Sequence, residues 1–457
     1  MADTYCWFGK NDKARPLYQK VIDNWPAAQH CLWAQMGIAI SYIADGNDLA
    51  AKDAVDKLIL NYSDNEKLPE ALFYIAGRYG WSKKYDDAYD IFQYIAEHFP
   101  QTVWAENAVF ESHKNNVYQF LDNRDEPNAL AAIDNFIDIY KDKEQLSAFI
   151  YDFGARADWL NGFGPNGLTE GIYNKVIANF PQSPQIGGTR ISLARMGILS
   201  LIDANDDPNA FAAIDKFIAD YNDFTVSTEE VFRISQRYYS KAMVLKYKQA
   251  DTDAAAGYFY DAIEVKNRII KDLTKTNVTA ETLFGMGVIY SQELGNSEKG
   301  IEYFEALLDR YPEHENNDYT HYLLCRYYKQ LKREGRIEAA QADVKIESNM
   351  KAIIENYPQS RWSAKADFEL GVIKLQEGKI SEAVLLLENA LQKSLKPGSR
   401  ISTAKTVILL GNVLESSGQK DYALQVYKES IGFIEPQDPQ RAVIEAKIEQ
   451  LEGGEEI

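Results

Sequence analysis

Residues 127–140 read PNALAAIDNFIDIY and residues 208–221 read PNAFAAIDKFIADY, so ten of fourteen positions agree at a constant offset of 81. In both copies apolar residues recur three and four positions apart, which is the spacing of one face of an α-helix. Ile133, Phe136 and Ile137 form this stripe in the first copy. A helix repeated at a fixed offset indicates that the same packing problem recurs along the chain.

An aromatic residue ends successive helical stretches along the whole sequence. The intervals between these residues are 37, 37, 41, 40 and 41 positions, followed by 90, which leaves room for two longer units, and 46. The residues are Trp25, Tyr62, Phe99, Tyr140, Phe180, Tyr221, Tyr311 and Tyr357. The offset of 81 therefore spans two units, and residues 1–457 are predicted to form a single continuous array.

Each unit reads as two helices separated by a polar turn. In residues 364–391, AKADFELGVIKLQEGKISEAVLLLENAL, a first helix precedes Gly378 and a second helix carries Ala383, Leu387 and Ala390. Gly378 suits the left-handed residue that ends many helices. The unit is therefore predicted to be an antiparallel helical hairpin.

Small residues occupy corresponding places in several units. A glycine in the middle of a helix costs about 1 kcal/mol relative to alanine, so its recurrence predicts a close helix contact and not a catalytic role. The glycines of the first helices are Gly37, Gly77, Gly197, Gly287, Gly371 and Gly411, and the alanines of the second helices are Ala88, Ala129, Ala210, Ala383 and Ala423.

Proline marks the junctions between units. In Phe180-Pro181-Gln182-Ser183-Pro184, Pro181 ends one helix because it lacks an N–H group and disfavours helical geometry at Phe180. Ser183 is predicted to cap the next helix. Residues 99–102 and 357–360 have the same form.

This pattern resembles the tetratricopeptide repeat family. The resemblance implies an all-α fold, a right-handed superhelical solenoid of about ten to eleven antiparallel helical hairpins. Residues 144–180 depart from the pattern because their glycine is poorly placed, and residues 227–273 and 317–357 exceed the usual length of about 34. The best matches are Leu283, Met286, Gly287 and Tyr290, then Leu370, Gly371, Ala383 and Ala390, and finally Leu410, Gly411, Ala423 and Tyr427.

The predicted array has four segments. Residues 10–26 form a partial first unit that begins with a second helix, and residues 27–222 form an N-terminal array. Residues 223–357 contain the longer units, and residues 358–452 form a C-terminal array with a capping helix.

The resemblance also implies a ligand-binding face. In the family, first helices line a concave face that binds peptides or partner helices. Many of the corresponding positions are apolar here, which fits either a hydrophobic groove or a closed one. These peptide-groove candidates are Tyr74, Arg78, Trp81, Phe284, Val288, Ser291, Phe368, Val372, Leu375, Ile408, Asn412 and Glu415.

The charge of the chain restricts its partners. The formal net charge is -19, and no Lys/Arg block or basic stripe able to neutralise a run of phosphates stands out, so nucleic acid is not an expected ligand. The acidity keeps a large surface soluble, and it would also suit a partner with a basic face. No apolar stretch is long enough for membrane insertion.

Known catalytic and metal-binding motifs are missing from the sequence. HExxH, GxxxxGK[ST] and GxSxG do not occur, and the three cysteines have no CxxC spacing. Residues 162–167 formally fit GxGxxG, but they follow a predicted helix and not the strand that a dinucleotide site needs. The chain is therefore predicted to be no enzyme and to need no cofactor or metal.

Two functions remain open. The first is a non-enzymatic protein-protein interaction scaffold, with a protein or peptide partner bound on the concave face. The alternative is a glycan-binding protein that uses exposed Tyr and Trp side chains. The long units with Phe/Tyr-Pro-x-Ser/Thr boundaries resemble repeats of exported bacterial proteins, which favours the periplasm if a signal peptide is missing from this chain. Partner identity and oligomeric state are not indicated.

Overall fold

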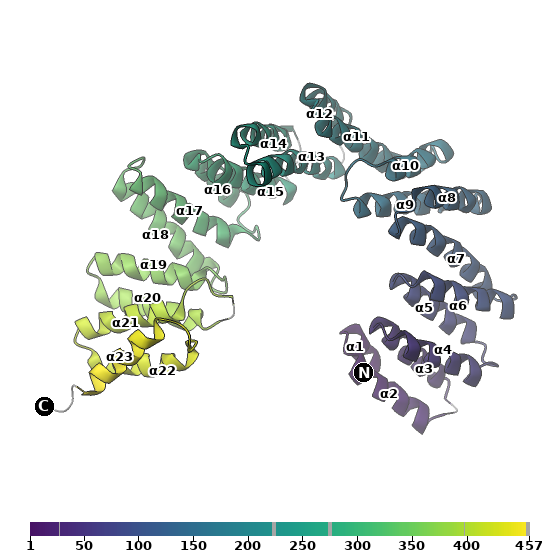
Figure 1. Ribbon diagram of the computed structural model, residues 1–457, viewed down its shortest axis with the longest axis horizontal. Coiled ribbons are helices and arrows are strands. Elements are labelled where there is room, and N and C mark those ends of the chain that lie inside the picture. Colours follow the sequence, from purple (N-terminus) through teal and green to yellow (C-terminus); the bar gives the residue numbers. More distant parts are fainter. Residues whose placement is uncertain (27, 222–224, 273–276, 397, 454–457) are drawn as a thin grey trace. The chain divides into compact units, whose positions relative to one another are not determined.

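The computed structural model describes residues 1–26, 28–221, 225–272, 277–396 and 398–453, and these contain helices and connecting turns but no strand (Figure 1). They form two compact units, Met1–Ala213 and Ile214–Ile457. The division falls inside one helix, α12. The predicted boundary between residues 222 and 223 lies outside the described residues. No described helix is long and apolar enough to cross a lipid bilayer.

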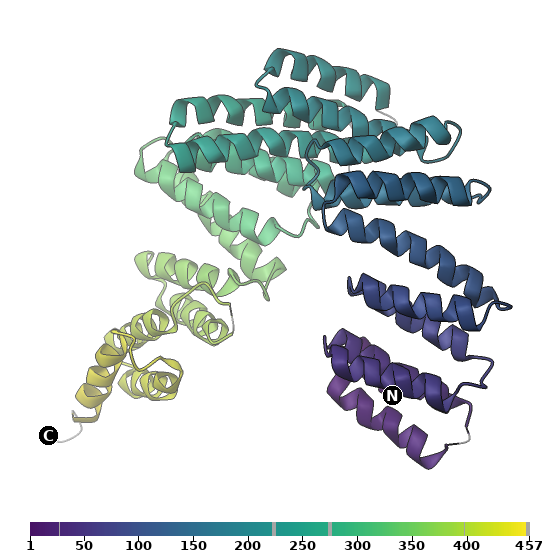
Figure 2. The same cartoon turned by 45° about the vertical axis from the view of Figure 1, so that its right-hand side comes forward.

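In the first unit consecutive hairpins stack on one another (Figure 2). The odd-numbered helices from α3 onward are the first helices of the hairpins, and the even-numbered helices are the second. The elements are α1 (Ala2–Trp7), α2 (Asn11–Asn24), α3 (His30–Ala44), α4 (Asp48–Asn61), α5 (Leu68–Trp81), α6 (Tyr85–His98), α7 (Val103–Asp122), α8 (Glu126–Tyr140), α9 (Leu146–Leu160), α10 (Gly167–Asn179), α11 (Ile186–Asp203) and α12 (Asp207–Tyr221).

The second unit continues the same alternation of first and second helices. Two short π-helical turns, η1 and η2, extend α13 and α15, and a 3-10 turn, η3, follows α22. The elements are α13 (Thr225–Val244), η1 (Leu245–Gln249), α14 (Thr252–Asp272), α15 (Asn277–Val288), η2 (Ile289–Glu293), α16 (Ser297–Arg310), α17 (Asn317–Arg333), α18 (Ala339–Asn356), α19 (Ser363–Gln376), α20 (Ile380–Ser394), α21 (Thr403–Ser416), α22 (Lys420–Ser430), η3 (Ile431–Phe433) and α23 (Arg441–Glu452).

The prediction of an all-α array of antiparallel hairpins is confirmed. The duplicated sequences form α8 and α12, which are second helices in corresponding places. Ile133 and Phe136 of α8 are buried, as are their counterparts Ile214 and Phe217 of α12. The alanines expected at the start of second helices, such as Ala129 and Ala383, are fully buried as well. The repeated sequence therefore encodes a repeated packing surface.

Three junctions between consecutive hairpins use the same proline turn. The backbone N–H of Thr102, Ser183 and Ser360 donates to the carbonyl oxygen three residues earlier, at 3.0, 3.0 and 2.9 Å. Proline follows the accepting residue in each case, which suits the first central position of a β-turn. The prediction that Ser183 caps the next helix was wrong, because α11 begins at Ile186 and its N-terminal flanking residue is Gln185.

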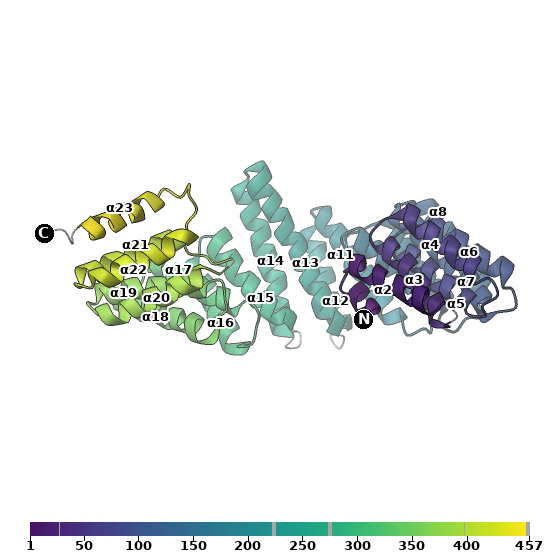
Figure 3. The same cartoon turned by 90° about the horizontal axis from the view of Figure 1, so that it is seen from below.

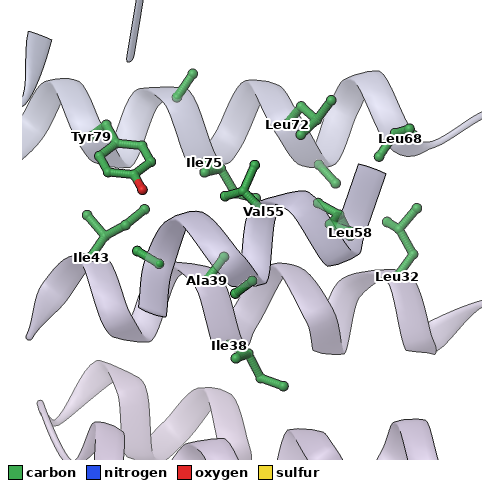
Figure 4. Packing of buried hydrophobic residues seen from close by; sticks show 14 of the residues in the cluster. Leu32, Ile38, Ala39, Ile43, Val55, Leu58, Leu68, Leu72, Ile75 and Tyr79 are labelled. Carbon is green, nitrogen blue, oxygen red and sulfur yellow. The ribbon is translucent and has the colours of Figure 1, made fainter. Parts of the chain in front are cut away.

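The core of each unit lies between its helices. Figure 4 shows this packing in the first unit, where Leu32 and Ile43 of α3 and Leu72 of α5 flank Val55 and Leu58 of α4. Leu32, Leu58 and Leu72 each expose 1% of their surface or less. Burial of such a side chain contributes about 1.5–3 kcal/mol, so packing between neighbouring hairpins is the main source of stability.

Several mid-helix glycines allow a bulky side chain to touch the backbone of the first helix. A Cβ atom at Gly287 would lie 2.5 Å from the Phe304 ring, and one at Gly411 would overlap the Tyr427 ring. Gly77 and Gly197 were expected to be similar, but a Cβ atom at either would meet no atom within 4 Å. The close contact was therefore predicted correctly at some positions and wrongly at these two.

Gly154 corrects the view that residues 144–180 lack a well-placed glycine. A Cβ atom at Gly154 would lie 2.5 Å from the buried Tyr173 ring of the same hairpin. We therefore expect Gly154→Ala to lower the free energy of unfolding by about 1–2 kcal/mol, because overpacking outweighs the gain in helix propensity. Urea unfolding of the full chain measures this change.

Gly197→Ala is the matched control. Gly197 also lies in the middle of a first helix, α11, within the compact unit Met1–Ala213, but it has open space around it. This variant should raise the free energy of unfolding by about 0.5–1 kcal/mol through helix propensity alone. A change of the same sign in both variants would contradict the packing argument.

Both ends of the array differ from the predicted units. A six-residue helix, α1, precedes α2 and packs against it. The described array therefore does not begin with the second helix of a hairpin, as the sequence predicted for residues 10–26. The Tyr18 hydroxyl of α2 donates to Asp3 of α1 at 2.5 Å. At the other end α23 lies across α21 and α22 (Figure 3). There Lys447 of α23 donates to Glu415 of α21 at 2.9 Å.

Candidate functional site

The second unit has a cavity of about 480 Å³ along the first helices α17 and α19. Its α17 residues recur at each helical turn, at positions 322, 325–326, 329–330 and 333, and so share one helical face. Glu369 of α19 forms the opposite wall. The residues that line the cavity are Tyr322, Cys325, Arg326, Lys329, Gln330, Arg333 and Glu369. We call this cavity the α17–α19 groove.

Cations dominate the α17–α19 groove. Arg326 and Arg333 are exposed, and neither forms an ion pair with any residue that the structure describes. Lys329 lies between them along the helix and pairs with Glu369 at 2.5 Å. Lys365 of α19 lies 3.9 Å from the same carboxylate. Glu369 therefore contacts Lys329 and Lys365, whereas the lining of the groove also contains Arg326 and Arg333.

Stacked aromatic rings form one end of the groove. The Trp362 ring stacks on Tyr322 with centroids 4.0 Å apart and on Tyr319 with centroids 5.2 Å apart. The Lys365 ammonium donates to the Tyr322 hydroxyl at 2.9 Å, and the Arg361 guanidinium lies 5.6 Å from the Trp362 ring. These contacts fix the position of Tyr322 and cover faces of its ring and of Trp362.

Cys325 gives the groove an uncharged floor. Its side chain is almost fully buried, and its thiol donates to the Ile346 carbonyl at 3.6 Å. Burial raises the pKa of the Cys325 thiol to about 12, so the thiol stays protonated near neutral pH. A protonated, buried thiol is neither a nucleophile nor a metal ligand. Among the residues in the described ranges, no three His, Cys, Asp or Glu side chains are grouped so that they could hold a metal ion.

The first unit has a cavity of about 430 Å³ along α5, α7 and α9. Its cations are paired with neighbouring carboxylates, in contrast to Arg326 and Arg333. Lys114 pairs with Glu111 at 2.6 Å, whereas Lys83 and Arg156 both pair with Asp122. The lining residues are Gly77, Gly80, Trp81, Lys83, Tyr85, Glu111, Lys114, Asn115, Tyr118 and Arg156.

Asp122 connects three consecutive hairpins beside this cavity. Its carboxylate accepts hydrogen bonds from Tyr85 at 2.9 Å and from Arg156 at 2.6 Å, and Lys83 lies at 3.0 Å. Burial by itself raises the pKa of the Asp122 carboxyl, but the bonds from Lys83, Arg156 and Tyr85 outweigh it and hold that pKa below its ordinary value. The group therefore stays ionised and acts as a structural anion.

The comparisons with known proteins concern parts of this array. Residues 288–377, which include all the residues that line the α17–α19 groove, match the sequence model of a family described as YfiO, outer membrane lipoprotein. No curated protein matches the sequence.

Solved structures that match the chain share little sequence with it. Human IFIT1, as a dimer with PPP-AAAA, is 16% identical, with 94% of this chain and 88% of that chain covered and a TM-score of 0.29. A tetratricopeptide repeat protein from Parabacteroides merdae is 10% identical, with 64% and 98% covered and a TM-score of 0.29. The P58(IPK) TPR domain is 14% identical, with 100% and 98% covered and a TM-score of 0.24.

The spacing of the glycine contacts in two hairpins matches that of a known repeat pattern. Gly411 faces Tyr427 and Gly371 faces Leu387, so the partner lies 16 positions later in both hairpins. Sixteen is also the difference between positions 8 and 24 of the tetratricopeptide pattern. The chain is built of tetratricopeptide-like repeats. Gly287 and Phe304, which are 17 positions apart, make the same contact in a repeat whose first helix ends in a π-helical turn.

The predicted groove positions of the tetratricopeptide-like repeats have different surroundings. Tyr74 and Trp81 of α5 are exposed, at 48% and 85%, and Trp81 lines the cavity of the first unit. Arg78 is partly buried between them. In the second unit the apolar candidates are partly buried and most pack against the core: Phe284, Val288, Phe368, Val372, Leu375 and Ile408. These positions favour closed surfaces over an open hydrophobic groove.

Two polar candidates are already bonded within the protein, whereas Asn412 is exposed. Ser291 is buried, and its hydroxyl donates to the Gly287 carbonyl at 2.6 Å. It lies inside η2, where the wider turn changes the direction of side chains relative to an α-helix. Glu415 accepts hydrogen bonds from Tyr427 at 2.8 Å and from Lys447 of α23 at 3.0 Å. A ligand at Glu415 would therefore compete with α23.

The cations of the α17–α19 groove were missed by the sequence analysis. They belong to residues 317–357, a stretched repeat that gave no clear match to the family positions. A signal was present, because Arg326, Lys329 and Arg333 fall on one face of a helix when residues 317–333 are placed in helical register. The prediction that the chain has no basic stripe is therefore wrong for α17, where Arg326, Lys329 and Arg333 form one.

Proposed function

We propose that the protein is a non-enzymatic scaffold that binds a segment of a partner protein along the first helices of its repeats. One observation carries this proposal: the α17–α19 groove is a cavity lined by two consecutive first helices, with two exposed arginines that form no ion pair with a described residue. Stacked repeats present an extended row of first helices, and tetratricopeptide-like repeats suit the recognition of a peptide or helix on such a row.

A location in the bacterial cell envelope is part of this proposal. The match of residues 288–377 to a family of outer membrane lipoproteins supports it. Glycan binding is a weaker candidate, because Trp104 and Trp362 are committed to ring contacts inside the protein. Trp81 is one of several exposed rings that still fit it, together with Trp7 and Trp25.

A photo-crosslinker in place of Gln330 tests the scaffold function. Gln330 lines the α17–α19 groove, so a residue at this position would touch a segment bound there. We expect irradiation of the full chain in its native host to give a discrete covalent adduct with one partner protein. Gel electrophoresis and mass spectrometry identify the adduct.

The same crosslinker at Leu385 is the control, because Leu385 lies on the second helix α20 and is 60% exposed. We expect no discrete adduct there. Equal adducts at both positions, or none at Gln330, would contradict binding along the first helices.

A further inference from the structure

The α17–α19 groove carries a surplus of positive charge in an acidic protein. Arg326, Lys329 and Arg333 line it and Lys365 borders it, whereas Glu369 is the carboxylate in its lining and pairs with Lys329. The chain as a whole has a formal net charge of -19, so an uncompensated cationic groove departs from the general charge balance. Unpaired cations that repel one another on one helix face are destabilising unless an anion is bound.

The surplus of positive charge is confined to the α17–α19 groove, because the cations of the first-unit cavity and Lys332 of α17 are paired with carboxylates. In the cavity of the first unit, Lys83, Lys114 and Arg156 each have a carboxylate within 3.0 Å. On α17 itself, Lys332 points away from the groove and pairs with Asp343 of α18 at 2.6 Å. Arg326 and Arg333 thus differ from these cations, because no described carboxylate lies within ion-pair distance of either, and Glu334 acts on Arg333 at longer range.

We propose that the α17–α19 groove binds a short acidic peptide segment, whose carboxylates pair with Arg326 and Arg333. This proposal rests on the scaffold function above and names the chemistry of the partner. A guanidinium binds a carboxylate through two parallel N–H···O bonds, which gives both affinity and orientation. The two arginines are seven positions apart, which places their backbones about 10 Å apart along the helix axis. Such spacing suits two separate carboxylates better than one small anion.

The surroundings of the arginines favour a peptide over a nucleic acid. Single-stranded nucleic acid binds by stacking its bases on open aromatic faces. The rings of Tyr322, Tyr319 and Trp362 stack on one another instead, with centroids 4.0 to 6.2 Å apart. The strong negative charge of the whole chain also repels a long polyanion more than a segment of a few residues. The expected partner segment is therefore acidic, whereas the net charge of the chain alone suited a partner with a basic face.

Fluorescence anisotropy with labelled hexapeptides tests this inference on the full chain. We expect a fluorescein-labelled hexaglutamate peptide to bind saturably and a hexalysine peptide not to bind. Arg326→Gln and Arg333→Gln should each weaken hexaglutamate binding by about tenfold, and the double variant by about a hundredfold, because each removes a charge-assisted pair.

Lys332→Gln is the matched control, because it removes one positive charge from the same helix outside the groove. It should change hexaglutamate binding by less than about twofold, since a distant surface charge is screened by salt. Circular dichroism of each variant should match the parent protein.

The proposal is overturned if hexaglutamate does not bind, or if the double variant binds it as well as the parent protein does. It is also overturned if an oligothymidylate of equal length binds more tightly and loses affinity in the same variants, which would indicate a nucleic-acid site. An adduct at Gln330 together with a failure of hexaglutamate would leave the scaffold function standing and reject the acidic segment.

Discussion

The Asp158→Ala variant is expected to lose about 3–5 kcal/mol of free energy of unfolding, because it removes a carboxylate that pairs with a buried guanidinium. Arg195 of α11 is fully buried, and its Nη2 atom lies 2.5 Å from Oδ2 of Asp158 on α9. Arg195 also donates to the carbonyl of Phe163, whose φ of 60° places it in the left-handed region. Urea unfolding of the full chain measures the loss.

Asp53→Ala serves as the control for this prediction. Asp53 pairs with Lys57 one helical turn away in the same unit, but both side chains are about 60% exposed. Its removal should cost less than about 0.5 kcal/mol. The double variant Asp158→Leu with Arg195→Met should recover much of the lost stability, because apolar residues can replace a buried ion pair. A loss below about 1 kcal/mol in Asp158→Ala would show that the pair is not structural.

The second large effect concerns Lys266, a buried lysine of the second unit. Its side chain is 1% exposed, its Nζ atom has no hydrogen-bond partner among the described residues, and it lies 4.3 Å from the Phe232 ring centroid. Burial lowers the pKa of Lys266 to about 7, against a smaller opposing effect of Glu281. In the unfolded chain the pKa would be about 10.4.

The sign of the pH dependence follows from these two values. Between about pH 7 and pH 10 the unfolded state binds one more proton than the folded state, so the free energy of unfolding rises with pH. From pH 7 to pH 9 the contribution of Lys266 is about 2 kcal/mol, at about 1.4 kcal/mol per pH unit once the folded-state amine is neutral.

Lys266→Met removes this contribution while it keeps the length of the side chain. We expect the variant to be more stable than the parent protein at pH 7, and the difference to shrink by about 2 kcal/mol at pH 9. Urea unfolding at both pH values checks the change. Parallel pH profiles for the two proteins would mean that Lys266 is charged when folded.

The hairpins could be predicted from sequence because their determinants are local. Apolar periodicity, the proline turns and the glycines of the better-matched repeats are readable over a few tens of residues, and Gly287, Gly371 and Gly411 make the expected contacts. The glycine pattern failed where the second helix carries no bulky residue against it, as at Gly197. A mid-helix glycine therefore indicates close packing only when the second helix of its hairpin carries a bulky residue at the facing position.

The open binding surface could not be predicted in the same way, because it depends on residues far apart in sequence. Glu415 is occupied by Lys447, 32 positions later, through the packing of α23. Ser291 is turned inward by the π-helical turn η2. Conversely, Arg326 and Arg333 are available because no carboxylate in the described parts of the neighbouring helices lies within ion-pair distance of them, and this depends on how α18 and α19 pack.

The Asp122 carboxylate has a mechanical consequence for the first unit. A linear stack of hairpins can lengthen under tension by detaching one hairpin after another from its end, because each contacts mainly its neighbours. Asp122 joins the turn before α6, α6 itself and α9 through Lys83, Tyr85 and Arg156, so force applied to one of these hairpins is shared by all three. Residues 68–179 should therefore resist stretching as one block, a stiff segment within an otherwise extensible chain.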